Sequence, residues 1–189
     1  FALLHNIAHR PDACTEKVAL AFYYAKAIFF KGVSMRIQNI FFAVLNPVMR
    51  TLLKSRFHRL ASRDIAILSY RGRKTNRWYE TPLSYVYREQ NILLLSSYNT
   101  RWWQNFTDEP YPVELLVKRK TLRGMATLHS GQSEFLSSNV AFFLKQLPRD
   151  ASIYSVKMDS AGDPTENTMK DIGDRVILVV VELDAQNNN

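Results

Sequence analysis

A short run of cationic side chains is the part of this sequence best suited to binding chemistry. Between two strand-like segments it sets a glycine, a hydroxyl group and four cations, namely Arg71, Gly72, Arg73, Lys74, Thr75 and Arg77. A tight turn of this kind can present charge-assisted donors to an anion, and each such hydrogen bond contributes about 1.5–3 kcal/mol. The pattern predicts a phosphate site. The alternative is a solvated hairpin loop.

A tryptophan pair follows one hairpin later. Trp102 and Trp103 are adjacent, so on a helical turn they cannot face the same way. One is expected to enter the core while the other lines a cavity, and Arg101 and Asn105, one turn apart, could share that cavity wall. The alternative is that both rings serve packing. Together with the cationic turn, the pair indicates a ligand with a flat ring system and an anionic group.

Three tyrosines lie at strand spacing just after the cationic turn. Tyr79, Tyr85 and Tyr87 are separated by even intervals, so they share one face of a strand. Their hydroxyl groups could bind a substrate at the mouth of a barrel, or could simply bind water.

Common catalytic arrangements are absent from the sequence. The histidines, at positions 5, 9, 58 and 129, are dispersed and none has a metal-ligand spacing with another ligand type. There is no nucleophile elbow and no G-x-G-x-x-G dinucleotide motif. No catalytic residue and no metal site are therefore predicted, and any chemistry is expected to come from a bound cofactor.

Composition narrows the range of partners and compartments. The chain has 189 residues, 47% of them hydrophobic, with a net charge of +8 and a pI near 9.7, which favours anionic partners. No nucleic-acid-reading motif accompanies this charge, so no specific nucleic-acid partner is expected. A single Cys14 excludes an intrachain disulfide and suits a reducing compartment. We therefore expect a cytoplasmic protein, with peripheral attachment at the inner face of the membrane as an open alternative.

The first third of the chain has helical patterns. Helices are expected over residues 15–31, 34–45 and 47–60, so that residues 1–62 form an N-terminal helical extension. Neither of the first two expected helices reaches the length of ~20 residues that a membrane span requires. A first helix that is apolar on nearly every side, followed by a basic series from Arg50 to Arg63, could pack on protein or lie on an anionic membrane surface.

From residue 64 the pattern changes to strands. Strands are expected over residues 64–70, 79–87 and 91–97, a helical turn over 100–106, and a second hairpin through Arg119-Lys120. Pro82 inside its strand indicates an edge or a bulge, and Gly124 a bulge or a close approach. An amphipathic helix over 133–147 ends before Pro148, a polar loop fills 149–173, and a buried strand ends the pattern. We therefore predict an α+β fold, a split β-barrel of about six mostly antiparallel strands with an outer helix, over residues 63–189.

Several of these segments resemble the deazaflavin-dependent nitroreductase family. The resemblance rests on GRKTNRWYETPLSYVY, SSYNTRWWQNF, the VELLVKRKTLRGMATL hairpin and the terminal RVILVVVELD, and covers roughly residues 46–184. It implies a split barrel of the flavin-binding type that uses deazaflavin coenzyme F-420 as hydride donor to a quinone, nitro or enone acceptor. It also allows a homodimer. The loop Tyr98-Asn99-Thr100 is shorter than in characterised relatives, which leaves F-420, FMN or no cofactor as alternatives.

The resemblance also implies roles for individual residues. The implied cofactor-binding residues are Arg73, Lys74, Thr75, Tyr79, Pro82, Ser96, Ser97 and Trp102, and the implied substrate-binding residues are Tyr85 and Trp103, for a small aromatic or quinone-like acceptor. Where the family usually has glycine after the turn hydroxyl, this chain has Asn76, a residue that tolerates positive φ. The alternative function is a non-catalytic barrel subunit, membrane-peripheral or complex-associated through its N-terminal helices, that has lost its cofactor.

Overall fold

A computed structural model describes residues 64–107 and 109–185. The helices predicted for residues 1–62, and with them the predicted contact with membrane or protein, lie outside these described residues. The boundary at residue 62 therefore stays a prediction.

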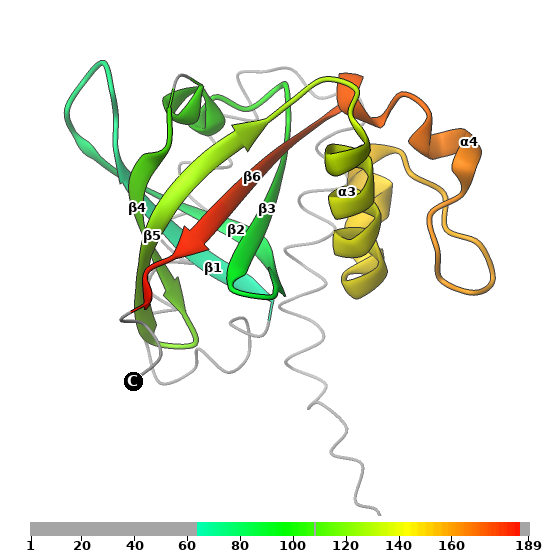
Figure 1. Cartoon of the computed structure of the whole chain (residues 1–189), viewed down its shortest axis with the longest axis horizontal. Helices are drawn as coiled ribbons and strands as arrows, with labels where there is room; N and C mark the ends of the chain where they lie inside the picture. The colour runs from blue at the N-terminus through cyan, green and yellow to red at the C-terminus, as the bar shows by residue number, and fades with distance from the viewer. Residues whose placement is uncertain (1–63, 108, 186–189) are drawn as a thin grey trace, which may run out of the picture.

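Six antiparallel strands form a closed barrel (Figure 1). They are β1 (Ile65–Arg71), β2 (Trp78–Arg88), β3 (Asn91–Ser97), β4 (Tyr111–Val117), β5 (Lys120–His129) and β6 (Val176–Leu183). Around the barrel their order is β1-β2-β3-β6-β5-β4, with β4 returning to β1. This arrangement confirms the predicted α+β barrel. It places β6 between β3 and β5, and the strand is buried, as its nearly continuous apolar sequence predicted.

Two tight turns define the lower end of the barrel in Figure 1. In the β2–β3 turn Glu89 adopts a φ of 57°, and in the β4–β5 turn Lys118 and Arg119 adopt 47° and 69°. The two successive positive φ values of the second turn match the right-handed twist of a hairpin. The second turn falls one residue earlier than predicted, because Lys120 already pairs with Val117 inside the ladder.

Alternate side chains of the strands fill the barrel interior. Inward residues such as Leu68, Leu94 and Leu115 are fully buried there, and Trp102 and Phe106 belong to the same cluster. These two aromatic residues belong to η2 (Trp102–Phe106), a short 3-10 helix that confirms the predicted helical turn. The inner core therefore includes side chains of this short helix as well as those of the strands.

A second core lies outside the barrel wall. The outward residues of β3 and β6, including Leu93 and Leu178, pack against α3 (Glu134–Gln146) through Phe143 and Leu144. The Ser133 side chain accepts a hydrogen bond from the Leu136 amide at 3.1 Å and begins this helix, as an N-cap does. The predicted outer amphipathic helix is thus confirmed.

The segment predicted as a long polar loop is largely ordered. It contains η3 (Pro148–Tyr154), α4 (Glu166–Met169) and η4 (Ile172–Asp174), and its apolar residues Ile153 and Ile172 are buried in the outer core. The Arg175 guanidinium donates to the carbonyl oxygens of Tyr154, Ser155 and Thr168, which ties these short helices to the start of β6. The prediction of a loop was wrong for residues 149–154, 166–169 and 172–173, because short helices with few apolar residues leave little periodicity in a sequence.

The structure agrees with the predictions made for Gly124 and Pro82. A Cβ atom at Gly124 would lie 2.2 Å from the Glu182 carbonyl oxygen, so β5 and β6 approach closely at this point. Pro82 pairs with Ile67 of β1, whereas β3 pairs with β2 only from Tyr85 to Arg88. In the described part of the chain, Pro82 therefore lies in a stretch that is paired on one side, which suits a residue without an amide hydrogen.

Candidate functional site

The cationic turn joins β1 to β2 at the upper end of the barrel. It is closed by hydrogen bonds from the Gly72 amide to the Arg77 carbonyl (2.8 Å) and from the Asn76 amide to the Gly72 carbonyl (2.7 Å). Asn76 adopts a φ of 53°, the left-handed conformation expected of an asparagine at this position. The Thr75 hydroxyl is 3.0 Å from the Tyr79 hydroxyl, so these two predicted site residues contact each other.

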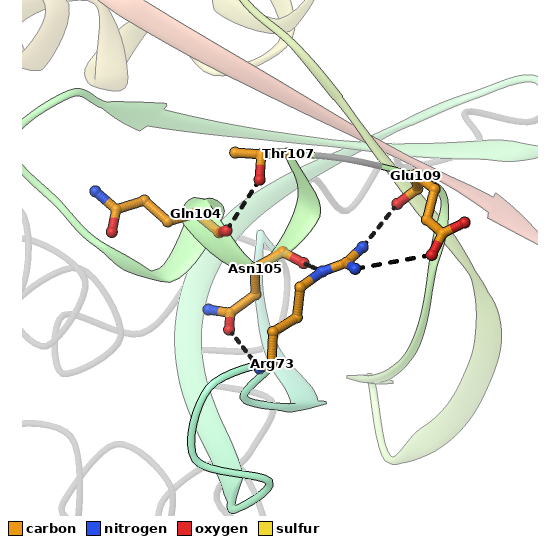
Figure 2. A network of polar contacts seen from close by, with 5 residues as sticks. All are labelled: Arg73, Gln104, Asn105, Thr107 and Glu109. Atoms are coloured by element: carbon orange, nitrogen blue, oxygen red, sulfur yellow. Dashed lines mark hydrogen bonds and ion pairs between the residues drawn. The ribbon is translucent and has the colours of Figure 1, made fainter.

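Arg73 connects this turn to the tryptophan segment (Figure 2). Its amide donates to Asn105 Oδ1 at 3.0 Å, and its Nε donates to the Asn105 carbonyl at 2.6 Å. The guanidinium also donates to the Glu109 carbonyl at 3.2 Å and lies 4.7 Å from the centre of the Tyr111 ring. The turn and the tryptophan segment, predicted to converge, are therefore in direct contact, and the contact is made by the Arg73 side chain itself.

The other turn residues face solvent. Lys74, Thr75 and Arg77 are exposed, and neither Lys74 nor Arg77 forms an ion pair with any residue that the structure describes. Arg73, by contrast, is only partly exposed because it contacts the tryptophan segment. Of the cations predicted to bind phosphate, Lys74 is thus available to a ligand in a way that Arg73 is not.

The two tryptophans differ in burial, and one of them, Trp102, enters the core as predicted. Trp102 is 8% exposed and packs edge-on against Phe106 inside the barrel, whereas Trp103 is half-buried and packs edge-on against Tyr98. The Nε1 of Trp103 is buried, and within the described part of the chain it has no hydrogen-bond partner. The Trp103 indole N–H is therefore an unpartnered donor within the described part of the chain, and Trp102 has a packing role in this conformation.

Three further predicted site residues, Pro82, Ser96 and Ser97, lie along the stretch where β2 and β3 are not paired, which we call the seam. Tyr85 pairs with Leu94, but the two strands are no longer paired beyond that point in the described ladder. Continued by two and three residues, the register would set Leu83 opposite Ser96 and Pro82 opposite Ser97. Ser97 Oγ is buried and has no partner among the described residues, whereas Ser96 Oγ contacts the Thr100 hydroxyl at 2.5 Å. The seam thus contains a second buried polar atom without a partner.

The three tyrosines of β2 share the inward face but differ in exposure. Tyr85 is 4% exposed inside the barrel, while Tyr79 and Tyr87, at the two ends, are 40% and 44% exposed. Burial raises the pKa of the Tyr85 phenol, and the nearby Tyr87 and Asp64 raise it further. Tyr85 therefore stays protonated at physiological pH, and Tyr79 is the tyrosine that a ligand at the cationic turn would meet.

A groove lies beside the turn on the outer wall of the barrel. Its volume is about 380 Å³, and its lining includes Arg71, Trp78, Tyr111, Glu114, Arg123 and Met125. Sequence reasoning missed this groove, since its residues come from four strands and meet only through cross-strand pairing. The partners of Arg73 were also missed, because Asn105 and Glu109 lie 32 and 36 positions away in sequence.

Two further findings concern metal-binding groups and membrane spans in the described part of the chain. No group of His, Cys, Asp and Glu suited to a metal ion occurs among residues 64–107 and 109–185. Among those same residues, no helix is long and apolar enough to cross a membrane.

Comparison with known proteins gives weak similarities to solved structures only. No family model and no curated protein matches the sequence. An F-420-H2-dependent reductase aligns over 64% of this chain and 95% of its own, with 16% identity and a TM-score of 0.44. A pyridoxamine 5'-phosphate oxidase-related, FMN-binding protein from Nostoc punctiforme aligns over 73% of this chain and 79% of its own, with 12% identity and a TM-score of 0.42.

A third structure, described as a domain-swapped dimer, aligns over 74% of this chain and 98% of its own, with 15% identity and a TM-score of 0.47. At these values the similarities establish neither a family nor an activity. The class that the structure itself defines is a closed six-stranded antiparallel barrel with an outer helix.

Proposed function

We propose that this protein is an oxidoreductase that transfers hydride from a reduced deazaflavin, or from a flavin, to a quinone, nitro or enone acceptor. The observation that carries the proposal is the contact between Arg73 and Asn105. It places a turn with exposed cations against a tryptophan segment, at the end of the barrel where β2 and β3 separate. A cofactor with a charged tail and a flat ring needs those two features side by side.

The side chains present fit such a cofactor. Lys74 and Thr75, both exposed, would hold its phosphate, with Arg77 adding charge. Ser97 Oγ and Trp103 Nε1 are buried and lack partners among the described residues, a state that costs about 1–3 kcal/mol for each group until a hydrogen bond is made. Polar atoms at the edge of a flavin or deazaflavin ring are suitable partners for both. When bound, the cofactor would supply the hydride.

The remaining residues would orient the reactants. Arg73 holds the cationic turn in place and Pro82 lies at the seam, so both act on the shape of the site rather than on the ligand's charge. Half-buried Trp103 would shield the ring from water, and the Tyr79 hydroxyl, 3.0 Å from that of Thr75, would donate to the acceptor. Tyr85 and Trp102, both buried in the barrel, would support this arrangement by packing.

One observation favours the alternative function. Trp102 and Phe106 are buried in the inner cluster of the barrel, so they occupy part of its interior in this conformation. A barrel interior occupied by its own side chains is what a non-catalytic subunit that has lost its cofactor would retain. A homodimer is compatible with either function.

Titration with F-420 and with FMN, followed by absorbance and fluorescence, tests the proposal. We expect binding of one of them at low micromolar concentration, weakened at least fivefold by Lys74→Gln. Lys120→Gln is the matched control, because it removes the same charge from a strand that begins at the opposite end of the barrel. Absence of binding of both cofactors at high micromolar concentration would favour the non-catalytic barrel, which co-sedimentation with anionic vesicles would then examine.

A further inference from the structure

The outer groove beside the cationic turn is built from four neighbouring strands. Arg71 pairs with Trp78, Pro112 with Met125, and Ser69 of β1 with Glu114 of β4. Two residues beyond Ser69 and Glu114, the same register brings Arg71 level with Pro112. A row of side chains therefore crosses the outer face from β2 to β5, in the order Trp78, Arg71, Pro112 and Met125.

This row offers an apolar, flat surface inside a concave site. Trp78 is 61% exposed and Met125 is 39% exposed, although both are large hydrophobic residues. The volume of the groove, about 380 Å³, lies within the roughly 300–1,000 Å³ typical of small-ligand sites. An indole left exposed within a groove is a platform on which a planar ring can stack.

The charges of the groove are distributed unevenly. Arg123 and Glu114 neutralise each other at 3.0 Å. Arg71 has no ion-pair partner among the described residues, and its guanidinium lies 6.0 Å from the centre of the Trp78 ring. Asp184 stands at the far side, after β6, where its amide donates to the Arg123 carbonyl at 3.0 Å. The groove thus has a cation at its Trp78 end and a carboxylate at the other.

We propose that this groove is a binding site for a planar aromatic anion. The ligand's ring stacks on Trp78 and contacts Met125, and its anionic group pairs with Arg71. Asp184 repels the anionic group from the opposite side and so fixes the direction of the ligand. The site does not depend on the proposed redox function, since Lys74, Ser97 and Trp103 take no part in it.

Equilibrium dialysis with naphthalene-2-sulfonate, and with 2-naphthol as its neutral analogue, tests this proposal without any cofactor. The sulfonate should bind at least tenfold more tightly than the naphthol. Arg71→Gln should abolish that preference while leaving naphthol binding within twofold. Trp78→Ala should weaken both compounds at least tenfold. Because both side chains are exposed, the variants are expected to keep the wild-type melting temperature, which circular dichroism checks.

Matched controls distinguish binding at this groove from a general electrostatic attraction between the anion and the basic protein. Arg77→Gln removes the same charge from the neighbouring turn, and Tyr87→Ala removes an exposed ring from the opposite end of β2. Both should leave sulfonate binding within twofold. The proposal is overturned if either control weakens binding as much as its groove counterpart, or if sulfonate and naphthol bind equally. Failure of the F-420 and FMN titrations would leave this result unaffected, so the two proposals fail separately.

Discussion

The guanidinium of Arg73 binds carbonyl groups of its own chain, although the sequence predicted a ligand for it. Its contacts to Asn105 and Glu109 join segments that are 32 and 36 positions apart. The sequence showed a cation on a turn, but it could not show that a carbonyl group would lie within 2.6 Å of its Nε. By contrast, the left-handed Asn76 was predictable, because the residue type alone allows that conformation.

We expect Arg73→Ala to lower the free energy of unfolding by about 2–3 kcal/mol, because it removes charge-assisted hydrogen bonds to carbonyl groups. Arg73→Lys should recover less than half of this loss, since an ammonium group lacks the planar fork that contacts two residues at once. Urea unfolding measures both. Arg77→Ala, at an exposed position of the same turn, should change stability by less than about 0.5 kcal/mol. An equal loss in the two alanine variants would contradict a special role for Arg73.

At the scale of elements, the strands were predictable and the short helices were not. Strand periodicity located all six strands to within about one residue at each end, and Ser133 and Pro148 marked the ends of α3. Between residues 149 and 173, order depends on long-range contacts such as those of Arg175, which leave no local pattern. The outer groove was missed for a similar reason: Trp78 and Met125 come to line one groove only after β1 and β4 have paired between their strands.

The close approach of β5 and β6 makes Gly124 hard to replace. In Gly124→Ala, the added Cβ would lie 2.2 Å from the Glu182 carbonyl oxygen, so the two strands must separate, and we expect a loss of about 3 kcal/mol. Gly162→Ala is the comparison, because nothing lies within 4 Å of its added Cβ and its φ of +80° alone is unfavourable. That strain should cost about 1–2 kcal/mol. Chemical denaturation compares them, and equal losses would argue against a steric cause.

The packing of His129 against α3 predicts a pH dependence of stability. Its ring lies 4.6 Å from that of Phe135, and partial burial lowers its pKa from the usual 6.5. The unfolded chain therefore binds a proton more readily, and stability falls as the pH drops below about 6.5. His129→Gln should flatten the difference in urea midpoint between pH 7.5 and pH 5.5. An unchanged pH dependence in this variant would assign the effect to other groups.

At the scale of the whole molecule, the barrel wall separates two cores. The inner core lies within the strands, and the outer core lies between β3, β6 and the helices. Both use the same strands, since alternate residues of β3 and β6 face opposite sides. The two cores should therefore unfold together.

The variants Ile92→Val in the inner core and Ile153→Val in the outer core test this unity. Each should cost about 0.5–1.5 kcal/mol. In the double variant the losses should add to within about 0.5 kcal/mol, because the two residues belong to different clusters. A single unfolding transition is expected in all three proteins by calorimetry. Two resolved transitions would show that the cores are independent units.

The position of β6 also affects how the protein is made. This strand follows the other five in sequence, yet it fills the gap between β3 and β5. A growing polypeptide on the ribosome consequently holds both neighbours with open hydrogen-bonding edges until the codons for residues 176–183 have been translated. Such edges are templates for pairing with other chains. Protection of the nascent chain by a chaperone should therefore matter most in that interval. The need for it should end once β6 has paired with β3 and β5 and the barrel has closed.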